Sequence, residues 1–299
     1  LPFWREAMLR FCCTSRLLSF ISLLLPITIS HWSAAQDKPY FVTYSQDLEE
    51  PGNLEIETKS AFGKPNEGNH YGALAGEFEY GATAWWTTEL YLDGQSTANE
   101  STIPTGERWE NRFRMLMREH AVNPVLYVEF ENITSADKNM LEVVGHDGQA
   151  DLAGPNADTR QDRLHEGELK LILSSNVRDW NISENFIAEK NLGHDPWEFG
   201  YAVAASRPLS TAYRECVFCL QKVTAGVEAY GGLGNTWELT MRDTSHYVAP
   251  VFGWYFPKQT RLTFSPAFGM TGSSLDRVFR VGFAVEIPQF AHLIFGGGR

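Results

Sequence analysis

Four pairs of glutamates recur between residues 55 and 168 with a spacing of two residues. The pairs are Glu55 and Glu57, Glu77 and Glu79, Glu129 and Glu131, and Glu166 and Glu168. In an extended strand, such a pair lies on one face with about 6.6–6.8 Å between its members. Two carboxylates at this distance repel each other unless a cation or an arginine lies between them. The pairs therefore predict a wall that either attracts cations or is neutralised by basic side chains.

The same spacing places further charged residues beside these pairs. They are Glu89, Glu110, Arg112, Arg114 and Arg280. Acidic side chains outnumber basic ones on these polar faces, which predicts a surface that favours cations and forms an ion path. We expect Arg112 and Arg114 to neutralise the nearest glutamates, which leaves the first two pairs available to solutes. The alternative, which stays open, is that the arginines bridge glutamates across a narrow interior filled with side chains.

Cys216 and Cys219 form a CxxC motif in a link between two predicted strands. A local disulfide is the natural interpretation in an oxidising compartment. Redox catalysis would need a βαβ unit, and haem attachment would need a histidine where Leu220 stands. The histidines are isolated, and no HxH or HExxH motif exists. We therefore expect no catalytic residue, no metal site and no cofactor.

The elements that position these residues are strands with alternating apolar and polar side chains. Residues 71–93 read YGALAGEFEYGATAWWTTELYLD and alternate on both sides of a break at Gly81 and Ala82. This pattern predicts a hairpin. Each arm has about ten residues, the length that crosses a bilayer core as a tilted strand. We therefore expect an apolar face toward lipid and a polar face toward an enclosed interior.

About twelve such segments follow one another along the chain. They are residues 54–62, 71–80, 84–93, 108–118, 124–132, 164–174, 177–190, 197–206, 222–231, 246–256, 259–271 and 275–287. Glu184 shares the apolar face of its segment, which predicts a bulge or an unusual contact there. Short and long links alternate, and the longest, residues 133–163, either enters the interior, caps one mouth or stays solvated. The expected fold is all-β: a closed antiparallel transmembrane β-barrel.

The N-terminal 35 residues have the features of a secretory signal peptide. Three arginines precede an apolar run at residues 17–29, and Ser33-Ala34-Ala35 forms a small-residue cleavage site. The apolar run is too short to span a membrane as a helix. We expect cleavage near Ala35–Gln36.

The remaining chain is then divided into three parts. These are a periplasmic segment at residues 36–53, the barrel at residues 54–290 and a tail at residues 291–299. The formal net charge of the whole chain is −12, which disfavours nucleic acid as a partner.

Two stretches carry a resemblance to a known class of proteins. The hairpin EFEYGATAWWTTELYLDG and the final segment RVFRVGFAVEIPQF, which ends at Phe290, resemble outer-membrane β-barrel proteins of Gram-negative bacteria, in particular poorly characterised porins and transporters. The resemblance implies a place in the outer membrane, contact with its lipid, and insertion by the barrel-assembly machinery through the C-terminal strand. The tail AHLIFGGGR departs from the pattern, because such insertion signals usually end the chain.

These observations favour a passive channel or transporter for small polar or cationic solutes. One alternative is a structural or binding barrel whose interior is filled by side chains. A lipid-modifying enzyme of the outer membrane is the third hypothesis.

Overall fold

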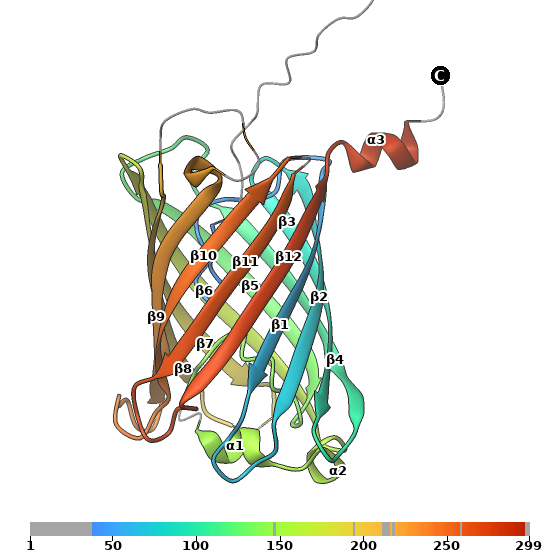
Figure 1. Ribbon diagram of the computed structural model, residues 1–299, viewed down its shortest axis with the longest axis vertical. Coiled ribbons are helices and arrows are strands. Elements are labelled where there is room, and N and C mark those ends of the chain that lie inside the picture. The colour runs from blue at the N-terminus through green and yellow to red at the C-terminus, as the bar shows by residue number, and fades with distance from the viewer. Residues whose placement is uncertain are drawn as a thin grey trace, which may run out of the picture. The chain divides into compact units, whose positions relative to one another are not determined.

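The computed structural model describes residues 38–145, 148–193, 195–210, 216, 219–257 and 259–296. The predicted signal peptide, residues 1–35, lies outside them. Within the described residues, twelve antiparallel strands close into a barrel, and each strand pairs with its neighbours in sequence (Figure 1). The final strand pairs with the first, which closes the ring. The predicted fold, a closed twelve-stranded antiparallel barrel, is confirmed.

The strands follow the predicted segments closely, with differences of a few residues at most ends. They are β1 (Leu54–Gly63), β2 (Tyr71–Thr83), β3 (Trp86–Thr97), β4 (Thr102–Arg114), β5 (Asn123–Thr134), β6 (Arg163–Val177), β7 (Trp180–Asn191), β8 (Glu198–Pro208), β9 (Val223–Asn235), β10 (His246–Phe256), β11 (Thr260–Gly269) and β12 (Arg277–Ile287). Short helices lie in the links and after the barrel: α1 (Gln149–Ala153), α2 (Asn156–Thr159), the 3-10 turn η1 (Leu220–Lys222) and α3 (Phe290–Phe295). Among the described residues, no helix is both long and apolar enough to cross a membrane.

Two local predictions about the strands are wrong. The link expected after residue 93 is strand, because β3 continues to Thr97 and β4 begins at Thr102, with a register shift at Asp93/Gly94. This bulge interrupts the alternation that marked the segment in the sequence. The bulge expected near Glu184 is absent, because β7 pairs regularly with β6 and β8 across that position. The Glu184 side chain is exposed on the outer face of the barrel.

Burial alternates along every strand because successive side chains point to opposite faces. In β12, Arg280 and Ala284 face inward and are buried, whereas Phe279 and Phe283 face outward and are 46% and 47% exposed. The outer face is therefore apolar, and the charged side chains lie inside.

The two ends of the barrel differ. Leu54 pairs with Ile287, so the first strand begins and the last strand ends at the same end. We call this end, which carries α3 and tight links such as the one between β6 and β7, the turn end. The opposite end carries the longest link, residues 135–162, and is called the loop end (Figure 1).

Candidate functional site

The charged candidates from the sequence all lie on inward-facing positions of the strands. Glu55, Glu57, Glu77, Glu79, Glu89, Glu110, Arg112, Glu129, Glu131, Glu168 and Arg280 are buried, Glu166 is half-buried, and Arg114 is partly exposed at the turn end. Arg114 donates a hydrogen bond to the Ala84 carbonyl oxygen at 3.2 Å and takes no part in the interior. The other side chains form compact ionic clusters along the barrel axis.

Arg112 lies at the centre of the first cluster. Its guanidinium contacts Glu79 at 2.5 Å, Glu110 at 3.1 Å and also Glu89. It donates a further hydrogen bond to the Asp47 carbonyl oxygen at 3.2 Å. One arginine therefore connects strands β2, β3 and β4 with the N-terminal segment, which is not part of the barrel wall.

The remaining glutamates of the first two pairs are held by two other basic residues. Lys59 Nζ lies 2.6 Å from Glu77 Oε2. Arg261 Nη2 lies 2.9 Å from Glu55 Oε1 and 2.7 Å from Glu57 Oε2. The expectation that these pairs stay available to solutes is wrong, because β1 pairs with β12 and brings Arg261 of β11 within reach.

Arg108, which the sequence analysis did not select, organises a second cluster nearer the loop end. Its guanidinium is 2% exposed and lies 3.0 Å from Asp93, 3.1 Å from Glu131, 2.9 Å from Asp137 and 3.0 Å from Glu142. The last two carboxylates belong to the long link between β5 and β6. A single cation thus ties that link to the barrel wall, while the carboxylates around it remain in excess.

Residues 38–48, part of the predicted periplasmic segment 36–53, lie inside the barrel at the turn end. Glu228 is fully buried and accepts hydrogen bonds from the backbone N–H groups of Phe41, Val42 and Thr43 at 2.8–3.2 Å. Three consecutive N–H groups directed at one carboxylate form an anion-binding nest. The Tyr44 hydroxyl donates to Glu110 at 2.9 Å. The segment is therefore attached to opposite sides of the interior.

The first part of the long link, residues 135–145, fills the interior from the loop end. Arg280 donates hydrogen bonds of 2.7 Å to the Met140 carbonyl oxygen and to the Tyr230 hydroxyl. Of the open alternatives for this link, the structure shows entry into the interior.

The two interior segments meet in the middle of the barrel. Phe41 of the first and Val143 of the second belong to one buried apolar cluster. The cavity left between Phe41, Asn139 and Leu141 is about 10 Å³, room for about one water molecule. The interior is thus closed in this conformation, mainly by backbone segments rather than by arginine–glutamate bridges across an empty lumen.

A larger cavity of about 540 Å³ remains under the long link at the loop end. Its charged lining is Arg108, Asp137, Glu142, Asp151, Glu166, Glu189 and Glu198. Burial raises the pKa of Glu142, but the positive charges of Arg108, Lys170 and Arg280 and the hydrogen bond from Arg108 together outweigh this effect, so the pKa lies below its ordinary value. With one arginine among these carboxylates, the cavity is an acidic pocket that attracts cations.

Two groups of carboxylates in the described residues come close enough to share a metal ion. They are Glu77, Glu79 and Glu89, and Glu131, Glu142 and Glu189. In the first group Lys59 and Arg112 supply positive charge, and in the second Arg108 does so. Basic side chains therefore balance part of the negative charge of both groups.

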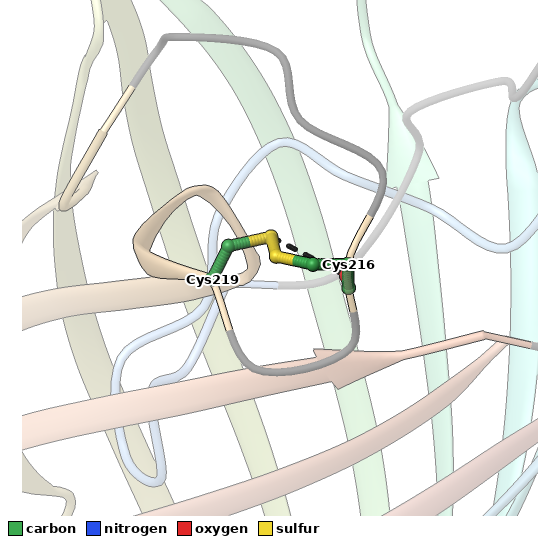
Figure 2. Close-up of a disulfide and its surroundings, with 2 residues drawn as sticks. All are labelled: Cys216 and Cys219. Carbon is green, nitrogen blue, oxygen red and sulfur yellow. Dashed lines mark hydrogen bonds between the residues drawn. A yellow bond between two sulfur atoms is a disulfide. The ribbon is translucent and has the colours of Figure 1, made fainter.

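Cys216 and Cys219 are joined by a disulfide close to η1, in the link between β8 and β9 (Figure 2). Their Cα atoms are 5.7 Å apart, within the usual range for a disulfide. Both residues lie in a turn-end link, away from the ionic clusters of the interior.

The residues that the sequence analysis missed fall into two kinds. Arg108 is the first residue of the predicted segment 108–118 and lies on the same face as Glu110 and Arg112. The alternation of the sequence therefore indicates it. Tyr44, Asp137 and Glu142 lie in segments without periodicity. No sequence signal indicates that such residues enter a barrel.

No family model matches this chain, and no curated protein matches it either. Among solved structures, an outer membrane channel from Pseudomonas putida F1 is similar with a TM-score of 0.52 and 9% identity, over 84% of this chain and 100% of that one. The NanC porin has a TM-score of 0.49 at 8% identity over 78% and 100% of the two chains, and the KdgM porin has 0.47 at 8% over 77% and 98%. At such identities the likeness concerns the fold. The chain has the barrel fold of Gram-negative outer-membrane channels, as its resemblance to that class of proteins predicted.

Proposed function

We propose that this protein is an outer-membrane channel for small cationic solutes, described here with its interior closed. The observation that carries the proposal is the distribution of charge and apolar surface over the two faces of one barrel. Carboxylates dominate inside, whereas the outside is a continuous apolar band. A water-soluble protein would not expose such a band, and a lipid bilayer covers it.

The outer band and the tryptophans support the place in the membrane. Outward side chains such as Phe78, Leu90 and Phe130 are 40–45% exposed around the ring. Trp85 and Trp180 lie beside strand ends and are also exposed, where an indole gains from an apolar body and a wet N–H group. In this placement the turn end faces the periplasm and the loop end faces outward.

The preference for cations follows from the charge balance inside. Arg108 and Arg112 each face at least three carboxylates, so they reduce the negative charge without cancelling it. The acidic pocket at the loop end adds further carboxylates at the outer mouth. A cation that approaches from outside would therefore meet favourable potential before it meets the closed middle.

Conduction requires that the two interior segments separate, because Phe41 of residues 38–48 and Val143 of residues 135–145 belong to one buried apolar cluster. The test is conductance in planar bilayers of the wild-type protein and of a variant that lacks residues 38–48. We expect low or intermittent conductance from the wild type, steady conductance from the variant, and a reversal potential that indicates cation preference. Anion preference in the variant would contradict the proposed solute class.

A second function, a binding or structural barrel, is favoured by one observation. The N-terminal segment is held by specific contacts, including the three hydrogen bonds to Glu228, as a permanent plug would be. If the shortened variant inserts and folds but conducts no ions, this second function replaces the first.

Export and assembly complete the proposal. Cleavage of the signal peptide near Ala35–Gln36 would place the new N-terminus next to Lys38, where the described part of the interior segment begins. The alternating side chains of β12, followed by Phe290, support recognition by the barrel-assembly machinery. Replacing Phe290 with serine should lower the amount of assembled barrel in outer-membrane fractions.

A further inference from the structure

A groove of about 530 Å³ lies on the outer wall at the loop end, apart from the interior. It is formed where β12, β1 and β2 lie side by side, at the end of the barrel opposite α3 (Figure 1). Its charged lining consists of Lys64, His70, Asp276 and Arg277, and its apolar lining includes Phe62 and Phe279.

The strand registers place the basic residues in one row. Gly63 pairs with Val278 of β12 and with Tyr71 of β2. One residue further along, Lys64 therefore stands opposite Arg277 on one side and His70 on the other. On its other side, the His70 carbonyl oxygen accepts a hydrogen bond of 2.8 Å from the N–H group of Ala98, which follows β3.

Lys64 and Arg277 point outward, because Phe62 and Phe279, two residues away on the same face of their strands, are exposed. Lys64, His70 and Arg277 are themselves exposed and form no side-chain hydrogen bond or ion pair with any described residue. Like charges directly opposite each other in a sheet are destabilising. Asp276, the acidic residue in the lining, offsets only part of this charge.

An aromatic row lies next to the basic row, on the side that faces the turn end and the bilayer core. Phe62 pairs with Phe279, and Phe279 in turn pairs with Pro266 of β11. On the other side, a Cβ atom at Gly72 would lie 3.1 Å from the Phe62 ring, so the ring packs against β2. Leu74 and Phe264 follow on the turn-end side of this row and are also exposed. Cationic groups thus lie at the loop-end edge of a continuous apolar strip.

We propose that this groove binds a phosphorylated lipid of the outer leaflet, with its phosphate between Lys64 and Arg277 and its acyl chains along the aromatic row. The basic row contrasts with the chain as a whole, which is acidic with a net charge of −12. A phosphate with about two negative charges relieves the repulsion of the basic row and forms charge-assisted hydrogen bonds with it. The inference rests on the outer-membrane placement proposed above, but not on conduction.

The test measures binding of lipid A, an acylated phosphorylated saccharide, to the full-length protein in nanodiscs. The variant is Lys64→Gln combined with Arg277→Gln, and Arg242→Gln is the control, an exposed arginine in the link between β9 and β10. We expect the double variant to bind lipid A about 100-fold more weakly, at about tenfold for each charge-assisted contact, and the control to bind as the wild type does. Lipid A without its phosphates should bind the wild type as weakly as lipid A binds the double variant.

Three results would overturn the proposal. They are equal binding by the double variant and the wild type, equal binding of the dephosphorylated lipid, and displacement of lipid A by an equal concentration of inorganic phosphate. A Phe62→Ala, Phe279→Ala variant should lose affinity but keep the preference for the phosphorylated form. Since the groove lies on the outer wall, the double variant should conduct as the wild type does, so the channel proposal is tested separately.

Discussion

At the scale of single residues, the interior is organised by a few charged groups with several partners each. Arg112 and Arg108 each connect carboxylates from different strands, and Glu228 connects three backbone N–H groups of the N-terminal segment. Such buried charges are costly unless they are paired. Removing one partner therefore affects every element that it connects.

Replacing Glu228 with glutamine should release the N-terminal segment. The neutral amide oxygen is a weaker acceptor, and hydrogen bonds to a charged group are worth about 1.5–3 kcal/mol. We expect the amide hydrogens of residues 41–43 to exchange at least about tenfold faster, measured by hydrogen exchange with mass spectrometry. Glu238→Gln, at an exposed glutamate in a loop-end link, should leave the exchange unchanged. Unaltered protection in the Glu228 variant would mean that other contacts hold the segment.

Acid should loosen the long link by protonating Glu142. Because the pKa of Glu142 is lowered in the folded protein, its pairing with Arg108 stabilises the link fully above the ordinary carboxyl pKa of about 4.3. This contribution is lost as the pH falls below that value and through the lowered pKa. We expect exchange of residues 135–145 to accelerate in this range. In a Glu142→Gln variant the exchange should be fast at neutral pH as well, and a variant that keeps the wild-type pH profile would refute the assignment.

At the scale of elements, each strand is a boundary between lipid and a charged interior. In β12, exposed Phe279 and Phe283 and half-buried Val281 alternate with buried Arg280 and Ala284. This strand also closes the barrel against β1, so a defect in it affects the whole ring.

A charge on the outer face of β12 should therefore destabilise the barrel. Arginine at a lipid-facing position near the midplane costs about 2–4 kcal/mol. We expect Val281→Arg to lower the free energy of unfolding by about this amount in urea titrations with lipid vesicles. Val281→Leu, which keeps the position apolar, serves as the control. If both variants were equally stable, Val281 would not face lipid.

At the scale of the whole molecule, two segments outside the strands close an acidic barrel from opposite ends. The acidic pocket at the loop end is a cavity of about 540 Å³ under the long link. Its carboxylates are therefore the first charges that a solute would meet on its way into the channel.

Neutralising the pocket should reduce cation preference. In the variant without residues 38–48, Glu166→Gln and Glu198→Gln together should shift the reversal potential toward zero at low salt. The shift should disappear near 1 M salt, where screening acts over about 3 Å. The same two changes should not affect assembly, because neither glutamate is completely buried. A selectivity that is unaffected at low salt would exclude the pocket from the ion path.

The sequence by itself determined the features of the single strands. The alternation of residues such as Phe279 to Ile287 determined the number of strands and the face on which each charged side chain lies, because an extended chain leaves no other arrangement of side chains. It also predicted that charged side chains such as those of Glu55 and Arg280 face one common interior. Order around the ring followed, since neighbouring segments joined by short links pair with each other.

What fills the interior was decided by the tertiary structure alone. The contact of Arg261 with Glu55 joins residues 206 positions apart, and that of Phe41 with Glu228 joins residues 187 positions apart. Both depend on closure of the ring, which fixes which strands face each other across the lumen. The segments that enter the lumen, residues 38–48 and 135–145, have no periodic pattern because their backbone groups bond to individual side chains instead of to a neighbouring strand. Their position is therefore a property of the closed barrel, and it could not be derived from local sequence.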